Sequence, residues 1–331
     1  MTALSRKDLG EPRVDDVSGW DLLRVAIARY NDVPREEAIA TLGTSHALWL
    51  AYASVLSPGD EVLVEDPGYE PLERAAEAAG ARVSKFARPS ATRFALDPER
   101  IARAMTPKTR VVAVTNLHNP TGARASDDVL RDIARLVESR GGYLLVDEVY
   151  APLDDLVDDR GVFTKSARKL GANVLATSSL TKCYGLGNER VGWLLAPPDV
   201  ITRAEHAIVA TCGVLPLNHA HLGVQAFSRI APLSTRARGL IAGKRERVSR
   251  WIASRPDLSW SEPDAGLFGF ATVDSSTDLT PLIERAAEDE GVLVAAGSFF
   301  GVPNGFRLSW SIAEDKLDEA LARLERVLAR W

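Results

Sequence analysis

Short apolar strands alternate with amphipathic helices through the first two thirds of this chain, and this alternation constrains the fold more than any other feature. Residues 109–116, 143–148 and 173–179 are rich in aliphatic and β-branched side chains, which is typical of buried strands. Further strands are expected at residues 61–66 and 81–86, and helices at residues 45–56, 70–80, 96–105 and 126–141. Strands that alternate with helices form sheets covered on both faces. The sequence therefore predicts an α/β fold, with a mostly parallel sheet sandwiched by helices.

The last third of the chain has a different pattern and predicts a second, smaller domain. Residues 236–255 are basic with an apolar stripe, which predicts one long helix leading out of the first domain. Strand-like segments follow at residues 267–273, 292–297 and 306–312, with helices at residues 279–291 and 315–331. A chain of 331 residues usually exceeds what one core can hold. We therefore expect a large domain at residues 31–235 and a small α+β domain made of residues 1–30 and 236–331.

Charge and hydropathy argue against several classes of partner. The net charge is −5 and no block of Lys and Arg is present, so we expect no nucleic-acid partner. The first residues carry charges where a signal peptide needs an apolar stretch, and no apolar run is long enough to cross a bilayer. Cys183 and Cys212 form neither a disulfide framework nor a metal-binding motif. These features favour a cytoplasmic protein without a membrane partner or a metal site.

Three polar residues follow three successive predicted strands. Asn119 lies shortly after one strand, Asp147 lies at the end of the next, and Lys182 lies shortly after the third. The carboxyl ends of parallel strands meet at one edge of the sheet, where such folds bind their ligands. We therefore expect these three side chains to share one site.

Lys182 has unusual neighbours for a lysine. Small and hydroxyl residues surround it, an apolar run precedes it, and a glycine-containing turn separates it from Arg190. Such surroundings suit a lysine that forms a Schiff base with an aldehyde. Arg190 would supply a fixed positive charge for a phosphate group. Together the two residues indicate pyridoxal 5′-phosphate. The alternative for Lys182 alone is a surface lysine without chemistry.

Four motifs, GTSHAL, NLHNPTG, VDEVY and SLTKCYGLGNERVGW, occur along the chain. With them the sequence resembles, from about Gly19 onward, the class I/II aminotransferases, a family of fold-type I enzymes that depend on pyridoxal phosphate. The resemblance implies that Lys182 holds the cofactor and serves as general acid and base. It implies that Asp147 pairs with the pyridine nitrogen, and that Asn119 and Tyr150 donate to the ring oxygen. The plainer alternatives are a helix cap for Asp147 and a turn residue for Asn119.

The same resemblance implies a phosphate site, a stacking residue and a carboxylate site. The phosphate would be bound by Thr44, Ser45, Ser179 and Arg190. Tyr69 would stack on the cofactor ring. Arg307 and Asn119 are the expected substrate-binding residues, and Arg307 would grip the α-carboxylate through its planar guanidinium. The plainer alternatives are a helix cap for Ser45, a turn tyrosine for Tyr69 and a structural ion pair for Arg307.

The chain departs from the family pattern in two places. The segment before Gly19 is short, and residues 11–19 contain no tyrosine of the kind that family members offer near the phosphate of a partner subunit. We therefore expect a more open active site or a trimmed form of the enzyme. Residues 206–218 contain no Arg or Lys, whereas dicarboxylate-specific members carry a second arginine in the comparable stretch. This difference favours a neutral, aromatic or unusual amino donor over aspartate or glutamate.

The resemblance predicts an aminotransferase that moves an amino group from an amino acid to a 2-oxo acid in ping-pong order. An alternative is decarboxylation, β-elimination or cyclisation of an amino acid, because these reactions share the same cofactor residues. A non-catalytic cofactor-binding module is a third hypothesis, and the presence of both Lys182 and Asp147 argues against it. The resemblance also implies a homodimer.

Overall fold

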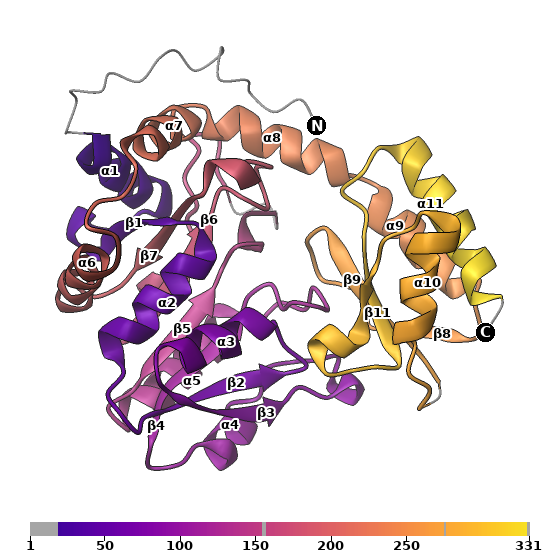
Figure 1. Ribbon diagram of the computed structural model, residues 1–331, viewed down its shortest axis with the longest axis horizontal. Helices are drawn as coiled ribbons and strands as arrows, with labels where there is room; N and C mark the ends of the chain where they lie inside the picture. Colours follow the sequence, from indigo (N-terminus) through magenta and orange to yellow (C-terminus); the bar gives the residue numbers. More distant parts are fainter. Residues whose placement is uncertain (1–18, 154–156, 275, 330–331) are drawn as a thin grey trace.

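The computed structural model describes residues 19–153, 157–274 and 276–329, which form a large unit and a small unit (Figure 1). Helix α8 (Ile230–Ile241) and helix α9 (Lys244–Ala253) lead from the large unit to the small one. The short segment before Gly19, with its missing tyrosine, lies outside the described residues. The two-unit organisation is the one that the change of pattern in the sequence predicts.

A central sheet of seven strands holds the large unit together within the described ranges. The strands are β1 (Ala38–Leu42), β2 (Glu61–Asp66), β3 (Arg82–Ala87), β4 (Thr109–Thr115), β5 (Tyr143–Asp147), β6 (Val174–Ser179) and β7 (Val191–Leu195). Their order is β1-β7-β6-β5-β4-β2-β3, and β7 is the strand that runs against both of its neighbours. The pairs from β6 to β3 are parallel. The predicted mostly parallel sheet is confirmed.

Helices cover both faces of this sheet. They are α1 (Gly19–Asn31), α2 (Thr44–Val55), α3 (Glu70–Ala78), α4 (Pro98–Ala104), α5 (Asp127–Glu138), α6 (Pro198–Cys212) and α7 (Leu217–Phe227). Along β4, Val111 and Ala113 belong to the core that includes α2, α3 and α6, whereas Val112 and Val114 belong to the core with α4 and α5. Successive strand residues point to opposite faces, so a continuous apolar strand supplies both cores. In the described part of the chain, no helix has the length and apolar character needed to cross a membrane.

The small unit is built on a four-stranded antiparallel sheet among the described residues. Its elements are β8 (Leu258–Trp260), β9 (Phe268–Val273), α10 (Thr280–Glu290), β10 (Ala295–Ala296), β11 (Gly305–Ser309) and α11 (Glu314–Leu328). The strand order is β10-β11-β9-β8, and Phe306 and Trp310 are fully buried in the core below it. The strand expected at residues 292–297 is reduced to β10, because the chain turns into a short 3₁₀ helix at Gly297–Phe300.

The prediction of one helix over residues 236–255 is wrong. Helix α8 ends at Ile241 and α9 begins at Lys244, with Gly243 between them at a φ of 71°. A left-handed residue ends a right-handed helix, and glycine adopts this conformation without steric cost. Ala237 packs in the core of the large unit and Val248 in that of the small unit. The break therefore separates two helices that serve different cores.

Helix α1 packs on the large unit, although the sequence grouped residues 1–30 with the small domain. Leu23 and Ile27 share a buried core with Trp193 of β7 and with α7. Trp20 also donates a hydrogen bond to the backbone oxygen of Leu215, at 3.0 Å. We therefore propose a large domain that begins at residue 19 and ends near residue 242.

Candidate active site

A cavity of about 220 Å³ lies at the carboxyl ends of β1, β2, β4, β5 and β6. It is lined by Thr44, Ser45, Leu48, Tyr69, Thr115, Asn119, Asp147, Val149, Tyr150, Ser179, Thr181, Lys182 and Arg190. The structure thus brings together every residue that the sequence analysis assigned to the cofactor. Arg307, on β11 of the small unit, reaches the same place through a 2.6 Å hydrogen bond from Nη1 to Oδ1 of Asn119.

Lys182 follows β6, lines the cavity and remains exposed to solvent. Partial burial lowers the pKa of its amine, and the positive charges of Arg307 and Arg190 lower it further, while Asp147 opposes them. A lower pKa increases the neutral fraction of the amine at neutral pH. Lys182 is therefore better suited to act as a nucleophile or a base than an ordinary surface lysine.

Asp147 ends β5 with a carboxylate that is only half satisfied. Its Oδ1 accepts a hydrogen bond from the backbone nitrogen of Val149 at 3.0 Å. This contact forms a local turn, because the following 3₁₀ helix begins only at Ala151. Its Oδ2 is buried without a hydrogen-bond partner among the described residues, and burial raises the pKa of Asp147 to about 7. A buried acceptor without a donor costs about 1–3 kcal/mol. A protonated ring nitrogen would satisfy this oxygen, so Asp147 fits the implied cofactor.

The neighbouring carboxylate, Glu148, points away from the cavity to the opposite face of the sheet. Its oxygens accept hydrogen bonds from the hydroxyl of Ser166, at 3.0 Å, and from the backbone nitrogen of Ala167. Strand alternation explains this direction, because consecutive side chains leave a strand on opposite sides. Asp147 is therefore the carboxylate of this pair that faces the ligand.

The phosphate side of the cavity combines a helix start, a hydroxyl and an arginine. Helix α2 begins at Thr44, whose hydroxyl is buried without a partner in the described chain. Arg190 donates from Nη2 to the backbone oxygen of Leu42 at 3.2 Å. Free backbone N–H groups at a helix start, a hydroxyl and a guanidinium together suit a phosphate. The alternative of Ser45 as a helix cap is wrong, because Gly43 occupies the cap position.

Gly43 is required by both its conformation and its close contact with Arg190. Its φ is 80° and ψ 176°, a region that is essentially restricted to glycine. A Cβ added there would lie 2.9 Å from Cζ of Arg190 and would overlap its Nη2. A side chain at residue 43 would therefore displace the guanidinium of Arg190 from this turn.

We expect Gly43→Ala to reduce the free energy of unfolding by about 1–3 kcal/mol and to weaken pyridoxal phosphate binding. Urea unfolding and fluorescence titration with the cofactor measure the two effects. Gly59→Ala is the matched control, since Gly59 has a φ of 95° but no atom within 4 Å of an added Cβ. Strain alone would lower stability in both variants. Equal cofactor affinity in both would contradict the role of the Arg190 contact.

Arg307 is held without a carboxylate partner in the described chain. Its guanidinium lies over the rings of Phe268 and Phe300, with 5.1 Å from Cζ to each centroid. No acidic oxygen of the described residues lies within 4.0 Å of it, so the structural ion pair is not found. Cation–π contacts hold the plane of the group, and the N–H donors that Asn119 does not use are left for a ligand. The geometry suits a bidentate carboxylate.

Two tyrosines complete the wall of the cavity. Tyr69 lies at the start of α3, and Tyr150 packs edge-on against Phe268, with ring centroids 4.6 Å apart at 81°. Burial raises the pKa of both phenols, so both stay protonated at neutral pH and can donate hydrogen bonds.

Sequence reasoning missed Thr115 and the aromatic support of Arg307. Thr115 ends β4 and lines the cavity, and the same rule that selected Asp147, a polar residue at the end of an apolar strand, applies to it. Phe268 and Phe300 had no comparable signal, because they belong to the small unit and meet Arg307 only after folding.

The carboxyl-terminal edge of the sheet thus brings together the residues that the resemblance implies for the cofactor site. The chain belongs to the aminotransferase class I and II family, whose model matches residues 13–324. It is a pyridoxal-phosphate-dependent aminotransferase of fold type I. Capreomycidine synthase of Streptomyces vinaceus is 32% identical to it, over 94% of this chain and 79% of that protein. The arginine–pyruvate transaminase of Pseudomonas aeruginosa is 28% identical, over 95% and 82%. A mutant aspartate aminotransferase of Thermus thermophilus has a similar structure, with a TM-score of 0.80, 28% identity, and coverage of 92% and 85%.

Proposed function

We propose that Lys182, Asp147 and Arg307 carry the transfer of an amino group from an amino acid to a 2-oxo acid. The observation that carries this proposal is the buried Oδ2 of Asp147, which has no hydrogen-bond partner among the described residues and lies in the same cavity as the amine of Lys182. A buried acceptor and an amine of lowered pKa at one ligand site are what this chemistry requires.

The cofactor residues divide by the part of pyridoxal phosphate that each would hold. Asp147 would keep the proton on the ring nitrogen, and Asn119 and Tyr150 would donate to the ring oxygen. Tyr69 would stack on the ring. The phosphate would be bound by Thr44, Ser45, Ser179 and Arg190. When bound, the cofactor supplies an electron sink that stabilises negative charge at the Cα of the substrate.

Lys182 is the proposed base for the Cα proton. Partial burial and the nearby charges of Arg307 and Arg190 lower its pKa and favour its neutral form, which is the form that accepts a proton. Arg307 binds the α-carboxylate of the amino acid in the same cavity, which orients Cα toward the amine. Transfer in ping-pong order follows, because one site serves first the amino acid and then the 2-oxo acid.

The proposed amino donor is neutral, aromatic or unusual rather than a dicarboxylate. Residues 206–218, at the end of α6 and the start of α7, contain no Arg or Lys to pair with a second carboxylate. Capreomycidine synthase and the arginine–pyruvate transaminase are named for other reactions than aspartate transamination, whereas the similar solved structure is an aspartate aminotransferase. Because these relatives differ in substrate, their names support a substrate choice made outside the cofactor residues.

A different reaction on the same cofactor is the second candidate. Its support is the 32% identity to a protein named capreomycidine synthase, which is not named as an aminotransferase. Decarboxylation, β-elimination and cyclisation of an amino acid would all use the residues that hold the cofactor. The products distinguish these reactions from transfer.

We also propose a homodimer in the cytoplasm. Leu22 and Val25 expose 48% and 45% of their surface on α1, and Val214 exposes 82% between α6 and α7. These side chains lie on neighbouring elements, because α1 packs against α7 and Trp20 binds the backbone of Leu215, and clustered apolar side chains at a surface support a subunit interface. Light scattering of the purified protein measures the assembly directly.

The absorption spectrum of the purified protein with pyridoxal phosphate tests the proposed function. We expect a visible band that one amino acid removes, with release of its 2-oxo acid. Aspartate and glutamate should remove it more slowly than a neutral amino acid. Release of carbon dioxide or ammonia in place of a 2-oxo acid would favour the second candidate. A protein that forms no band would contradict the cofactor residues assigned here.

A further inference from the structure

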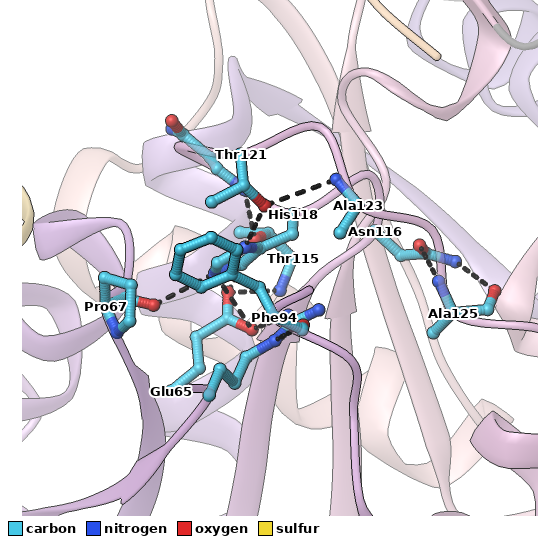
Figure 2. A network of polar contacts seen from close by, with 11 residues as sticks. Glu65, Pro67, Phe94, Thr115, Asn116, His118, Thr121, Ala123 and Ala125 are labelled. Carbon is cyan, nitrogen blue, oxygen red and sulfur yellow. Dashed lines mark hydrogen bonds and ion pairs between the residues drawn. The ribbon is translucent and has the colours of Figure 1, made fainter. Parts of the chain in front are cut away.

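A buried polar network lies beneath the candidate active site, where β2 and β4 end (Figure 2). Glu65 and Arg88 form an ion pair of 2.5 Å, and their side chains are 0% and 1% exposed. Oε1 of Glu65 accepts hydrogen bonds from the backbone nitrogen and the hydroxyl of Thr115, at 2.8 and 2.5 Å. Burying two charges costs desolvation energy, and apolar residues of similar size often stabilise a fold as well or better. Stability alone therefore does not account for this pair.

The network continues from Thr115 into the ligand site. The backbone nitrogen of Asn119 donates to the hydroxyl oxygen of Thr115 at 2.9 Å. Oδ1 of Asn119 then accepts from Nη1 of Arg307 at 2.6 Å. Hydrogen bonds thus join the buried carboxylate of Glu65 to the backbone of Asn119, and the side chain of the same Asn119 contacts the carboxylate-binding arginine.

We propose that Thr115 and Glu65 are positioning residues that fix the amide of Asn119, and through it the guanidinium of Arg307, for cofactor and substrate. The proposal rests on the proposed function, in which Asn119 and Arg307 bind these ligands. The Thr115 hydroxyl donates its hydrogen bond to Glu65, so the lone pairs of the hydroxyl oxygen can accept the hydrogen bond from the backbone nitrogen of Asn119. Arg307 occupies Oδ1 of Asn119, which leaves Nδ2 as the donor for the ligand.

The loop after β4 has separate supports that do not involve the hydroxyl of Thr115. His118 is buried, and its ring nitrogens contact the hydroxyl of Thr121 at 2.7 Å and the backbone oxygen of Pro67 at 2.9 Å. The side chain of Asn116 makes two hydrogen bonds with the backbone of Ala125, at 3.1 and 3.2 Å. Loss of the Thr115 hydroxyl should therefore change the orientation of Asn119 more than the backbone conformation of the loop.

Thr115→Val tests the proposal, because it removes the hydroxyl while keeping the shape. With pyridoxal phosphate as the probe, we expect the pH midpoint of the visible band to rise by about one unit, since a donor to the ionised ring oxygen is weakened. The apparent dissociation constant of 2-methylalanine, which has no proton on Cα, should rise about tenfold through the displaced Arg307. Thr115→Ser keeps the hydroxyl and should restore both values.

Thr109→Val is the matched control for this variant. Thr109 is buried on the same strand, β4, and its hydroxyl donates to Oε1 of Glu61 on β2 at 2.6 Å, at the end far from the cavity. It should lose a similar amount of stability in urea unfolding and shift neither ligand value. The proposal is overturned if Thr115→Val matches this control in both values, or if Thr115→Ser is as impaired as Thr115→Val.

A double variant separates positioning from stability. Glu65→Leu with Arg88→Met removes both charges at once, so no unpaired charge remains in the interior. We expect this protein to fold with a lower stability than the wild type, because the backbone nitrogen of Thr115 and the backbone oxygen of Phe94 lose their side-chain partners, and to show the shifts of Thr115→Val. A folded double variant with wild-type ligand values would overturn the proposal for Glu65.

The wild-type protein distinguishes failure of this inference from failure of the proposed function. A wild type that forms the visible band, together with an unshifted Thr115→Val variant, contradicts the positioning role alone. A wild type that forms no band contradicts the proposed cofactor residues, and with them the positioning role that rests on them.

Discussion

Replacing Lys182 by alanine should reduce the rate of amino-group transfer by about 10⁴-fold or more. The change removes the proposed base for the Cα proton, and positioned acid–base groups contribute about 10²–10⁴-fold. It also removes the amine that would hold the cofactor covalently. Borohydride reduction followed by mass spectrometry should find pyridoxal phosphate on the peptide that contains Lys182 in the wild type and on no peptide of the variant.

Lys169→Ala is the control for the loss of a lysine. Lys169 forms a surface ion pair of 2.7 Å with Asp32, and such pairs contribute about 0–1 kcal/mol. The activity and the covalent labelling of the Lys169→Ala variant should equal those of the wild type. Labelling of a lysine other than Lys182 in both the wild type and the Lys182→Ala variant would show that Lys182 is not the cofactor lysine.

Asp147→Asn should lower activity by about 10²–10³-fold and yet stabilise the cofactor-free protein at alkaline pH. Removing one fixed electrostatic partner of a reacting group commonly costs a factor of this size. Burial raises the pKa of Asp147 to about 7 from an ordinary value of 3.8. A carboxyl whose pKa is raised in the folded state contributes fully to stability only below about pH 3.8, and this contribution is lost as the pH rises from there through 7. Asparagine stays neutral at every pH, so the variant keeps this contribution to the free energy of unfolding.

The stability effect is measured as the difference between variant and wild type at two pH values. Urea unfolding of the cofactor-free proteins measures the free energy of unfolding at pH 4 and at pH 8. The difference between Asp147→Asn and the wild type should change by about 2–4 kcal/mol in favour of the variant over this range. Glu148→Gln is the control for activity, because Glu148 is also buried, with a pKa raised to about 8, but faces the other side of the sheet. Equal losses of activity in the two variants would contradict a specific role for Asp147.

Much of the site was predictable because its residues follow strands whose direction a local pattern determines. Asn119, Asp147 and Lys182 come from three strands, and parallel strands bring their carboxyl ends to one edge without any further information. The apolar character of β4 likewise predicted burial on both faces. Local patterns were sufficient here because strand direction alone decides where these side chains meet.

The remaining features depend on contacts between distant segments. Glu65 and Thr115 are 50 residues apart, and each looks like an ordinary strand residue until β2 and β4 pair. The break at Gly243 was hidden because a glycine within a helical pattern is often tolerated. The placement of α1 was missed because its apolar face fits any core, and only the packed structure shows that it meets Trp193.

The hydrogen bond between Arg307 and Asn119 spans the two units, since β11 belongs to the small unit and the loop after β4 to the large one. The distance from Arg307 to the amine of Lys182 is thus a property of how the units are oriented. A carboxylate bound at Arg307 is sensitive to that orientation, and by thermodynamic reciprocity its binding biases the orientation in turn. Substitutions at the joint between α8 and α9, remote from the cavity, should therefore alter substrate affinity without altering any group that contacts the substrate.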